Sequence, residues 1–145
     1  MEYSLRPSTA HDLDWLLDLR TVELRADLER HGIFDPVRVR TWMSDAFAPE
    51  NTQIIRVAGN DVGSISVRHE PDARWIEHFY LPSRLQGHGI GSQVLAEVLA
   101  RPDHRPFRLM VLQGSAALRL YARHGFTPYD EDDHDVWLTR PASVS

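Results

Sequence analysis

The sequence predicts a single α/β (α+β) domain whose central sheet is mixed but mostly antiparallel, with helices on both faces. Residues 52–58 and 62–68 alternate apolar and polar side chains around a Gly-Asn-Asp turn, which predicts an antiparallel hairpin. The apolar run 74–81 leads through a glycine-rich turn into a helix at 91–100, and an apolar strand follows at 107–113. Because a helix crosses between these last two strands, we expect them to lie parallel.

Length and composition fit one globular domain. The chain has 145 residues, of which 42% are hydrophobic and 26% charged, so it can bury a core without covalent staples. It contains no cysteine, which excludes disulfides, thiolate metal sites and cysteine nucleophiles. No apolar run of membrane-spanning length and no signal-peptide pattern is present, so we expect a cytoplasmic protein with no membrane partner.

The charge pattern limits the classes of partner and the catalytic groups that we expect. The formal net charge is −5, and all 16 basic residues are arginine. An acidic balance argues against a broad nucleic-acid-binding surface, and the lack of lysine excludes lysine as a catalytic group. The arginine bias is typical of a GC-rich bacterial genome, and a homodimer is compatible with the sequence.

The N-terminal third predicts a short strand and two helices. Residues 2–6 form the strand, and Thr9 with Asp12 fits a capping box that opens an amphipathic helix. Gly32 is placed to end that helix, and the Asp-Pro pair at 35–36 supplies the N-cap and first residue of the next.

The glycine-rich turn at residues 86–91 follows a strand and opens a helix. The first N–H groups of a helix lack intrahelical partners and carry partial positive charge, and glycines let an anion approach them. A phosphate or pyrophosphate is therefore the expected guest; the alternative is a strand–helix turn whose glycines only permit tight packing. No Lys-Ser/Thr pair follows, so the turn is not a P-loop, and residues 109–112 are apolar where NAD binding needs an acidic group.

The spelling Gln86-x-x-Gly89-x-Gly91 resembles the acyl-CoA pyrophosphate loop of the GCN5-related N-acetyltransferase (GNAT) family. A second block, residues 112–126, is similar to that family's strand-to-helix segment, with a tyrosine followed by Gly-Phe. The resemblance implies one GNAT domain over residues 1–145, whose fourth and fifth strands are parallel and splayed. It also implies an enzyme that moves acetyl directly from acetyl-CoA to a primary amine of a small molecule or peptide, without a metal.

The same resemblance assigns cofactor-binding residues. The pantetheine arm would bond to the backbone of His78, Phe79 and Tyr80 between the splayed strands. Two features depart from the family pattern: Ser115 follows a glycine where an asparagine often stands, and His88 replaces a basic residue. Backbone amides of the turn would hold the pyrophosphate, contributed by Gln86, Gly87, His88, Gly89, Ile90 and Gly91.

Acetyl transfer needs an acid for the departing thiolate and a base for the amine. The resemblance places Tyr121 near the sulfur as the acid; the alternative is a core tyrosine at helical spacing. Glu77 is charged within an apolar run, where burial would make it a stronger base, and His78 is the alternative. Strand alternation predicts that side chains fall on two faces, with Glu77, Phe79 and Leu81 on one and Ile76, His78 and Tyr80 on the other.

The acceptor is not specified by the sequence. In the family, the N-terminal helices form one wall of the acceptor site, so the resemblance makes Glu23 and Arg25 weak candidates for substrate contact, although solvated helix positions are the favoured explanation of each. The acidic run 130–135 fits a solvated loop; a metal site and electrostatic attraction of a cationic acceptor are the alternatives. A non-catalytic CoA-binding or sensor module and an interaction domain that keeps only the fold are the rival functions.

Overall fold

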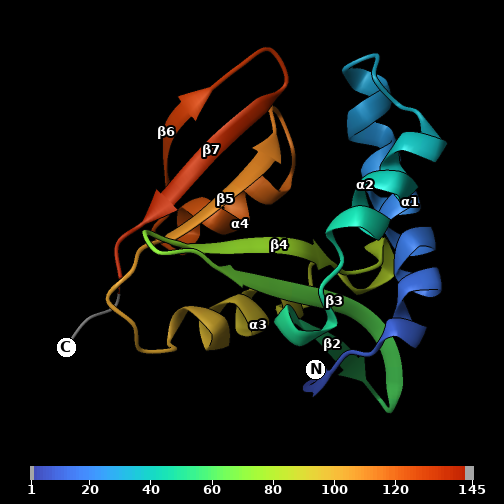
Figure 1. Ribbon diagram of the computed structural model, residues 1–145, viewed down its shortest axis with the longest axis horizontal. Helices are drawn as coiled ribbons and strands as arrows, with labels where there is room; N and C mark the ends of the chain where they lie inside the picture. The colour runs from blue at the N-terminus through green and yellow to red at the C-terminus, as the bar shows by residue number, and fades with distance from the viewer. Residues whose placement is uncertain (1, 143–145) are drawn as a thin grey trace.

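The computed structural model describes residues 2–142. In chain order its main elements are β1 (Ser4–Pro7), α1 (Leu13–Arg30), α2 (Pro36–Ala46), β2 (Thr52–Val57), β3 (Asn60–His69), β4 (Arg74–Tyr80), α3 (Ile90–Leu99), β5 (Phe107–Leu112), α4 (Ala117–Arg123), β6 (Thr127–Glu131) and β7 (Asp135–Arg140) (Figure 1). Single 3₁₀ turns precede α1, β2 and the glycine-rich turn, at Ala10–Asp12, Pro49–Asn51 and Ser83–Leu85. Within the described residues no helix has the length and apolar character needed to cross a bilayer.

The strands form one seven-stranded sheet in the order β1-β2-β3-β4-β5-β7-β6. Every neighbouring pair is antiparallel except β4 and β5, which are parallel. The expected sheet, with its one parallel pair on either side of a crossover helix, is therefore confirmed.

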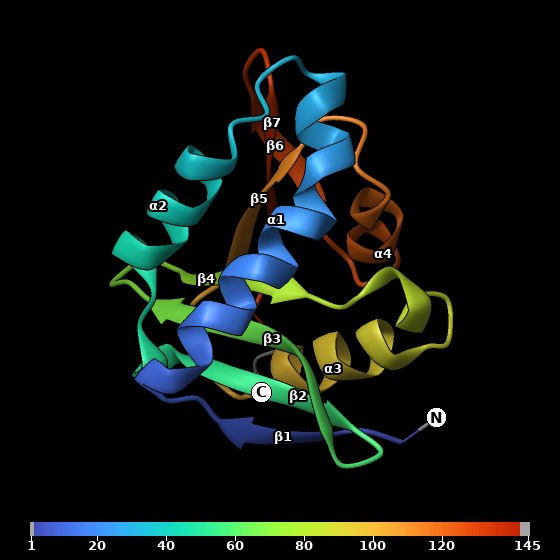
Figure 2. The same ribbon diagram turned by 90° about the vertical axis from the view of Figure 1, so that its right-hand side faces the viewer.

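Helices cover both faces of this sheet, as predicted. On one face α1 and α2 enclose a small cluster around Leu16, Leu17, Met43 and Ile54. On the other face α3 and α4 pack on the larger core, to which Val94, Leu95 and Val98 contribute fully buried side chains. Figure 2 shows α1 crossing in front of the strands with α3 behind them.

The predicted helix signals act as expected. Thr9 and Asp12 form the capping box, and the Asp35 carboxylate accepts from the first amides of α2.

The hairpin turn lies one residue earlier than predicted. Ala58 and Gly59 both have positive φ, 52° and 78°, and make a two-residue turn that pairs Val57 with Asn60.

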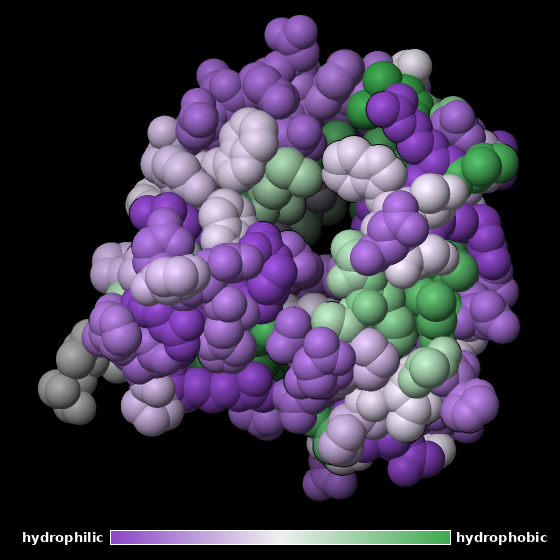
Figure 3. Space-filling model, in the orientation of Figure 1, coloured by the Kyte–Doolittle hydropathy of each residue, from purple (hydrophilic) through white to green (hydrophobic). Residues whose placement is uncertain are grey.

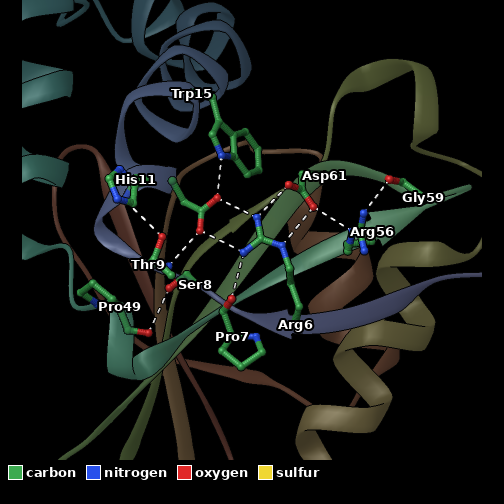
Figure 4. A network of polar contacts seen from close by, with 11 residues as sticks. Arg6, Pro7, Ser8, Thr9, His11, Trp15, Pro49, Arg56, Gly59 and Asp61 are labelled. Atoms are coloured by element: carbon green, nitrogen blue, oxygen red, sulfur yellow. Dashed lines mark hydrogen bonds and ion pairs between the residues drawn. The ribbon is translucent and has the colours of Figure 1, made fainter.

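An ion-pair network joins the start of α1 to the edge of the sheet (Figure 4). The Arg6 guanidinium bonds the carboxylates of Asp12 and Asp61 at 2.8 and 2.7 Å, and Arg56 bonds Asp61. The Asp12 carboxylate also accepts from the indole N–H of Trp15. These bonds lower the pKa of Asp12 to about 2, with Arg6 as the main cause, and anchor the helix that forms one wall of the site.

The acidic run is only partly a loop. β6 continues to Glu131 and β7 starts at Asp135, so the hairpin connection is shorter than predicted. The Asp132 carboxylate closes it by accepting from the amides of His134 and Asp135. Among residues 2–142 no group of three or more side chains suited to a metal ion is found.

Candidate active site

The parallel pair of strands separates after two residues. β4 and β5 are paired at Arg74 with Phe107 and at Trp75 with Arg108, and beyond this point β5 turns away from β4 (Figure 1). The backbone of β4 from Ile76 onward therefore has no β5 partner. This opening is the splay that the sequence resemblance implied.

A buried arginine fixes the point where the strands separate. Arg74 is 2% exposed, and its guanidinium donates to the carbonyls of Arg101 and Arg105 while lying 3.7 Å from the centroid of the Phe107 ring. Sequence reasoning missed this residue. Its only signal was an arginine at the first position of an apolar strand, which resembles an ordinary exposed end.

A β-bulge interrupts β4 beside the opening. Ser66 pairs with Glu77 and Ser64 with Tyr80, so one residue of β3 lies opposite two residues of β4, His78 and Phe79. His78 has a positive φ of 47°, and its carbonyl accepts a 2.7 Å hydrogen bond from the Ser64 hydroxyl. The bulge thus turns the backbone of residues 77–79 towards the slot between the strands.

Gly63 makes this close approach possible. A Cβ on this residue would lie 2.1 Å from the carbonyl oxygen of Tyr80, which is an impossible contact with rigid backbone. Glycine is therefore required at this position for β3 to meet the bulge.

The predicted alternation along β4 was wrong, because the bulge reverses it. Glu77 and Tyr80 pair with residues on the same face of β3, so they share the face covered by α1, where Tyr80 packs. Ile76, Phe79 and Leu81 instead pack in the core on the α3 side. A one-residue insertion moves every later side chain to the other face, and the sequence carried no turn residue to signal it.

A cavity of about 940 Å³ occupies the space between the splayed strands and the helices. Figure 3 shows the surface hollowed between the α1–α2 side and the β5–β7 side. This volume lies within the range for small-molecule sites, about 300–1,000 Å³. Of the predicted site residues it brings together Glu23, Glu77, His78, Phe79, Tyr80, Gln86, Gly87, Gly89, Gly91, Ser115 and Tyr121; His88, Ile90 and Arg25 do not line it.

The glycine-rich turn leaves the start of α3 open. The N-cap residue is Gly89, with φ 82° and no side-chain capping bond, and Gly87 also has a positive φ of 80°. Ile90 packs in the core and the side chain of His88 is exposed, so neither side chain lines the cavity. The Gln86 amide group donates to Glu23 and to the Leu81 carbonyl, both at 2.9 Å, which ties the turn to α1.

Tyr121 lies on α4 with its ring in the core and at the cavity wall. It is 8% exposed, and its ring meets Phe126 edge-on at 5.6 Å. Burial raises the pKa of Tyr121, so its phenol keeps its proton at neutral pH. Ser115 precedes the helix, and its hydroxyl accepts from the Ala117 amide at 3.2 Å, one residue before the formal N-cap.

Near the bulge, the side chains of His78 and Tyr80 both lie close to Arg20, and both have shifted pKa values. Both ring nitrogens of His78 are buried without a hydrogen-bond partner in the described chain, and burial, aided by Arg20, lowers the pKa of His78 to about 4. The imidazole is therefore neutral at pH 7. Arg20 also donates to the Tyr80 hydroxyl, although burial outweighs this bond and raises the pKa of Tyr80.

Glu77 is less buried than the sequence suggested. Its side chain is 30% exposed, and its carboxylate accepts from Arg68 at 2.9 Å. The ion pair, rather than burial, defines its environment, and its role as a base stays a prediction.

The candidate acceptor contacts divide. Glu23 lines the cavity, whereas Arg25 pairs with Glu29 at 2.7 Å and lies over the Phe34 ring on the outer surface.

The end of α1 also contacts the β6–β7 hairpin. The Nδ1 atoms of His31 and His134 are 3.1 Å apart, and His31 Nε2 donates to the Gln113 carbonyl at 2.9 Å. A neutral His31 must then accept at Nδ1, so His134 donates there. Sequence reasoning did not identify this pair, because the two histidines are 103 residues apart.

Residues 49–128 match the family model described as "Acetyltransferase (GNAT) domain". The chain belongs to the GNAT acetyltransferase family. This match covers more than half of the chain, and it confirms the predicted family and the prediction of an acyltransferase. A sequence comparison with curated proteins gave no significant match.

Solved structures share the fold at low sequence identity. The PaiA N-acetyltransferase from Thermoplasma acidophilum, in complex with coenzyme A, superposes with a TM-score of 0.75 at 17% identity over 97% of this chain and 99% of that one. An N-acetyltransferase from Staphylococcus aureus Mu50 gives 0.71 at 15% identity over 94% and 99%. N-acetylglutamate synthase from Neisseria gonorrhoeae, complexed with coenzyme A and L-arginine, gives 0.72 at 17% identity, with 97% of this chain covering 33% of that one.

Proposed function

We propose that this GNAT protein transfers the acetyl group of acetyl-CoA directly to a primary amine of a small molecule or peptide. The observation that carries the proposal is one cavity in which three features meet. These are the edge of β4 that has no β5 partner beyond Trp75, the open start of α3 at Gly89, and the protonated Tyr121.

The residues present fit coenzyme A. Gly89 and Gly91 put no side chain over the first amides of α3, and a Cβ at Gly91 would contact Leu81 at 3.6 Å. Amides of residues 86–91 would hold the diphosphate, and the backbone of residues 78–80 would pair with the pantetheine amides as an added strand. Ser115, at the opposite wall, would border the same arm.

Acetyl-CoA would supply the acetyl group as an activated thioester. The lone pair of the acceptor nitrogen forms the new C–N bond, the C–S bond breaks, and the sulfur takes the phenolic proton of Tyr121. An N–H of the bulged segment 78–80 would donate to the carbonyl oxygen as it gains charge. Before attack, the acceptor ammonium gives one proton to Glu77, or to the neutral imidazole of His78 through a water, and the second proton that the nitrogen loses as the amide forms returns to the Tyr121 phenolate.

Tyr121→Phe tests this assignment. The variant keeps the ring and its packing on Phe126 but loses the acid, so kcat should fall by roughly 10²–10⁴-fold while the Kd for acetyl-CoA stays within about twofold. Thiol release with a panel of primary amines measures turnover, and calorimetry measures binding.

The alternative is a non-catalytic CoA-binding module. It would bind CoA equally well and release no thiol with any amine in the wild-type protein. Wild-type turnover that persists in Tyr121→Phe would instead leave the enzyme assignment in place and remove Tyr121 as its acid.

A further inference from the structure

The mouth of the cavity on the acceptor side carries an unusual share of exposed apolar surface. Six large hydrophobic side chains are exposed in the described residues: Val22, Ile33, Val37, Trp42, Met110 and Tyr129. Three of them, Ile33, Trp42 and Met110, line the cavity, with exposed fractions of 41%, 59% and 45%. They come from three separate segments, and the fold brings them to one cavity.

These three residues line the same cavity as the glycine turn but lie on other elements of the fold. Trp42 is on α2, Ile33 lies in the connection from α1 to α2, and Met110 is on the diverging part of β5. Leu24, Leu28, Val39 and Leu112 continue the apolar lining inward. A bound molecule that covers the Trp42 ring and the Met110 thioether removes this surface from water.

Three charged groups that line the cavity are satisfied by the protein itself, whereas Arg38, one turn before Trp42 on α2, also lines the cavity and has no ion pair among residues 2–142. Asp27 pairs with Arg30 at 2.6 Å, Glu77 pairs with Arg68, and Asp35 caps α2. Apart from Arg38, the side chains offered around Trp42 are mainly apolar, and an acceptor with no apolar substituent would leave the Trp42 face in water.

We propose that the acceptor is a primary amine that carries a bulky apolar, preferably aromatic, substituent, which Trp42, Ile33 and Met110 bind. This inference rests on the proposed acetyl transfer. The amine projects inward past Tyr80 towards Glu77 and His78, and the substituent remains at the mouth between α2 and β5.

Matched amines test the proposal. 2-Phenylethylamine and ethylamine differ only by the phenyl group, so their kcat/KM values with saturating acetyl-CoA isolate its contribution. The kcat/KM of the wild-type protein should be at least about tenfold higher for 2-phenylethylamine, because burying an apolar group has an effect of this size. A ratio near one overturns the proposal.

Substitutions locate the preference. Trp42→Ala should lower the ratio by about tenfold and leave kcat/KM for ethylamine and the Kd for acetyl-CoA within about twofold, while Trp42→Phe should keep most of the preference. Val37→Ala is the matched control, because Val37 is also an exposed apolar residue on the same helix, at 72% against 59% for Trp42, but lies outside the cavity. An equal loss for both amines in Trp42→Ala would show a structural role and overturn the proposal.

The assay outcomes distinguish failure of the apolar acceptor from failure of acetyl transfer. If ethylamine is acetylated with the same kcat/KM as 2-phenylethylamine, acetyl transfer stands and the apolar acceptor is wrong. If acetyl-CoA binds but neither amine reacts, the apolar acceptor is wrong as well. If acetyl-CoA does not bind, the proposed function itself fails.

Discussion

On the side of β4, the glycine turn and α3, the cavity presents backbone, whereas on the side of α1, α2 and β7 it presents side chains. The first wall depends on a few positions where only glycine or a bulge fits, such as Gly63 and Gly89. The second depends on individual side chains, such as Trp42 and Glu23, on amphipathic helices. A backbone wall suits a constant cofactor, and a side-chain wall lets the acceptor vary without changing the fold.

The largest effect is expected where the backbone wall is tightest. Gly63→Ala places a Cβ 2.1 Å from the Tyr80 carbonyl oxygen, so β3 and the bulge must move apart. We expect a loss of about 3 kcal/mol or more in the free energy of unfolding, and weaker acetyl-CoA binding in whatever remains folded. Urea denaturation and calorimetry measure the two.

Gly59→Ala is the control for that variant. Gly59 has φ 78° in the hairpin turn with open space around it, so only backbone strain of about 1 kcal/mol is expected, with unchanged acetyl-CoA binding. Equal losses in the two variants would mean that the contact with the bulge does not matter.

His78 should make stability depend on pH. Its pKa is about 4 in the folded protein and 6.5 as a free side chain, so the unfolded state binds more protons between these values. Stability should be full above pH 6.5 and fall by about 3 kcal/mol as the pH drops towards 4. Because His124 also has a pKa lowered by burial, the part due to His78 is read from the difference between wild type and His78→Asn. A difference that stays constant from pH 7 to 4 would contradict the burial of His78.

A second loss of stability, at lower pH, should come from Asp12 at the start of α1. The pKa of Asp12 is lowered from 3.8 to about 2, so its pairing with Arg6 stabilises the fold above pH 3.8 and is lost as the pH falls towards 2. This contributes about 2 kcal/mol. Asp12→Asn should therefore be less stable than wild type at pH 7 and close to it near pH 2. A difference in stability between the two proteins that stays constant from pH 7 to pH 2 would argue against the network in Figure 4.

The smallest effects separate two neighbours on α1. Glu23→Gln weakens the bond that holds Gln86 and should raise the KM for acetyl-CoA a few-fold. Arg25→Ala removes only an exposed pair with Glu29, so stability should change by less than about 0.5 kcal/mol and the kinetics should not change. A kinetic effect of Arg25→Ala would place the acceptor elsewhere.

The same contrast explains what the sequence could predict. Glycine spacing, apolar runs and caps report local backbone, so the hairpin, the parallel crossover and the open start of α3 were predicted from residues close together in the chain. The bulge at His78 was not, because it depends on Gly63 across the sheet. Trp42 and Met110 meet only after the strands splay, and the contact between His31 and His134 likewise joins distant segments.

Amide hydrogen exchange with and without CoA tests the central claim most directly. Binding of the diphosphate at the start of α3 should slow exchange at residues 87–92, and strand-like pairing of the pantetheine arm should slow it at residues 77–80, while β1 and β2 stay unchanged. Protection confined to other segments, or none at saturating CoA, would contradict the assignment of this cavity as the acetyl-CoA site.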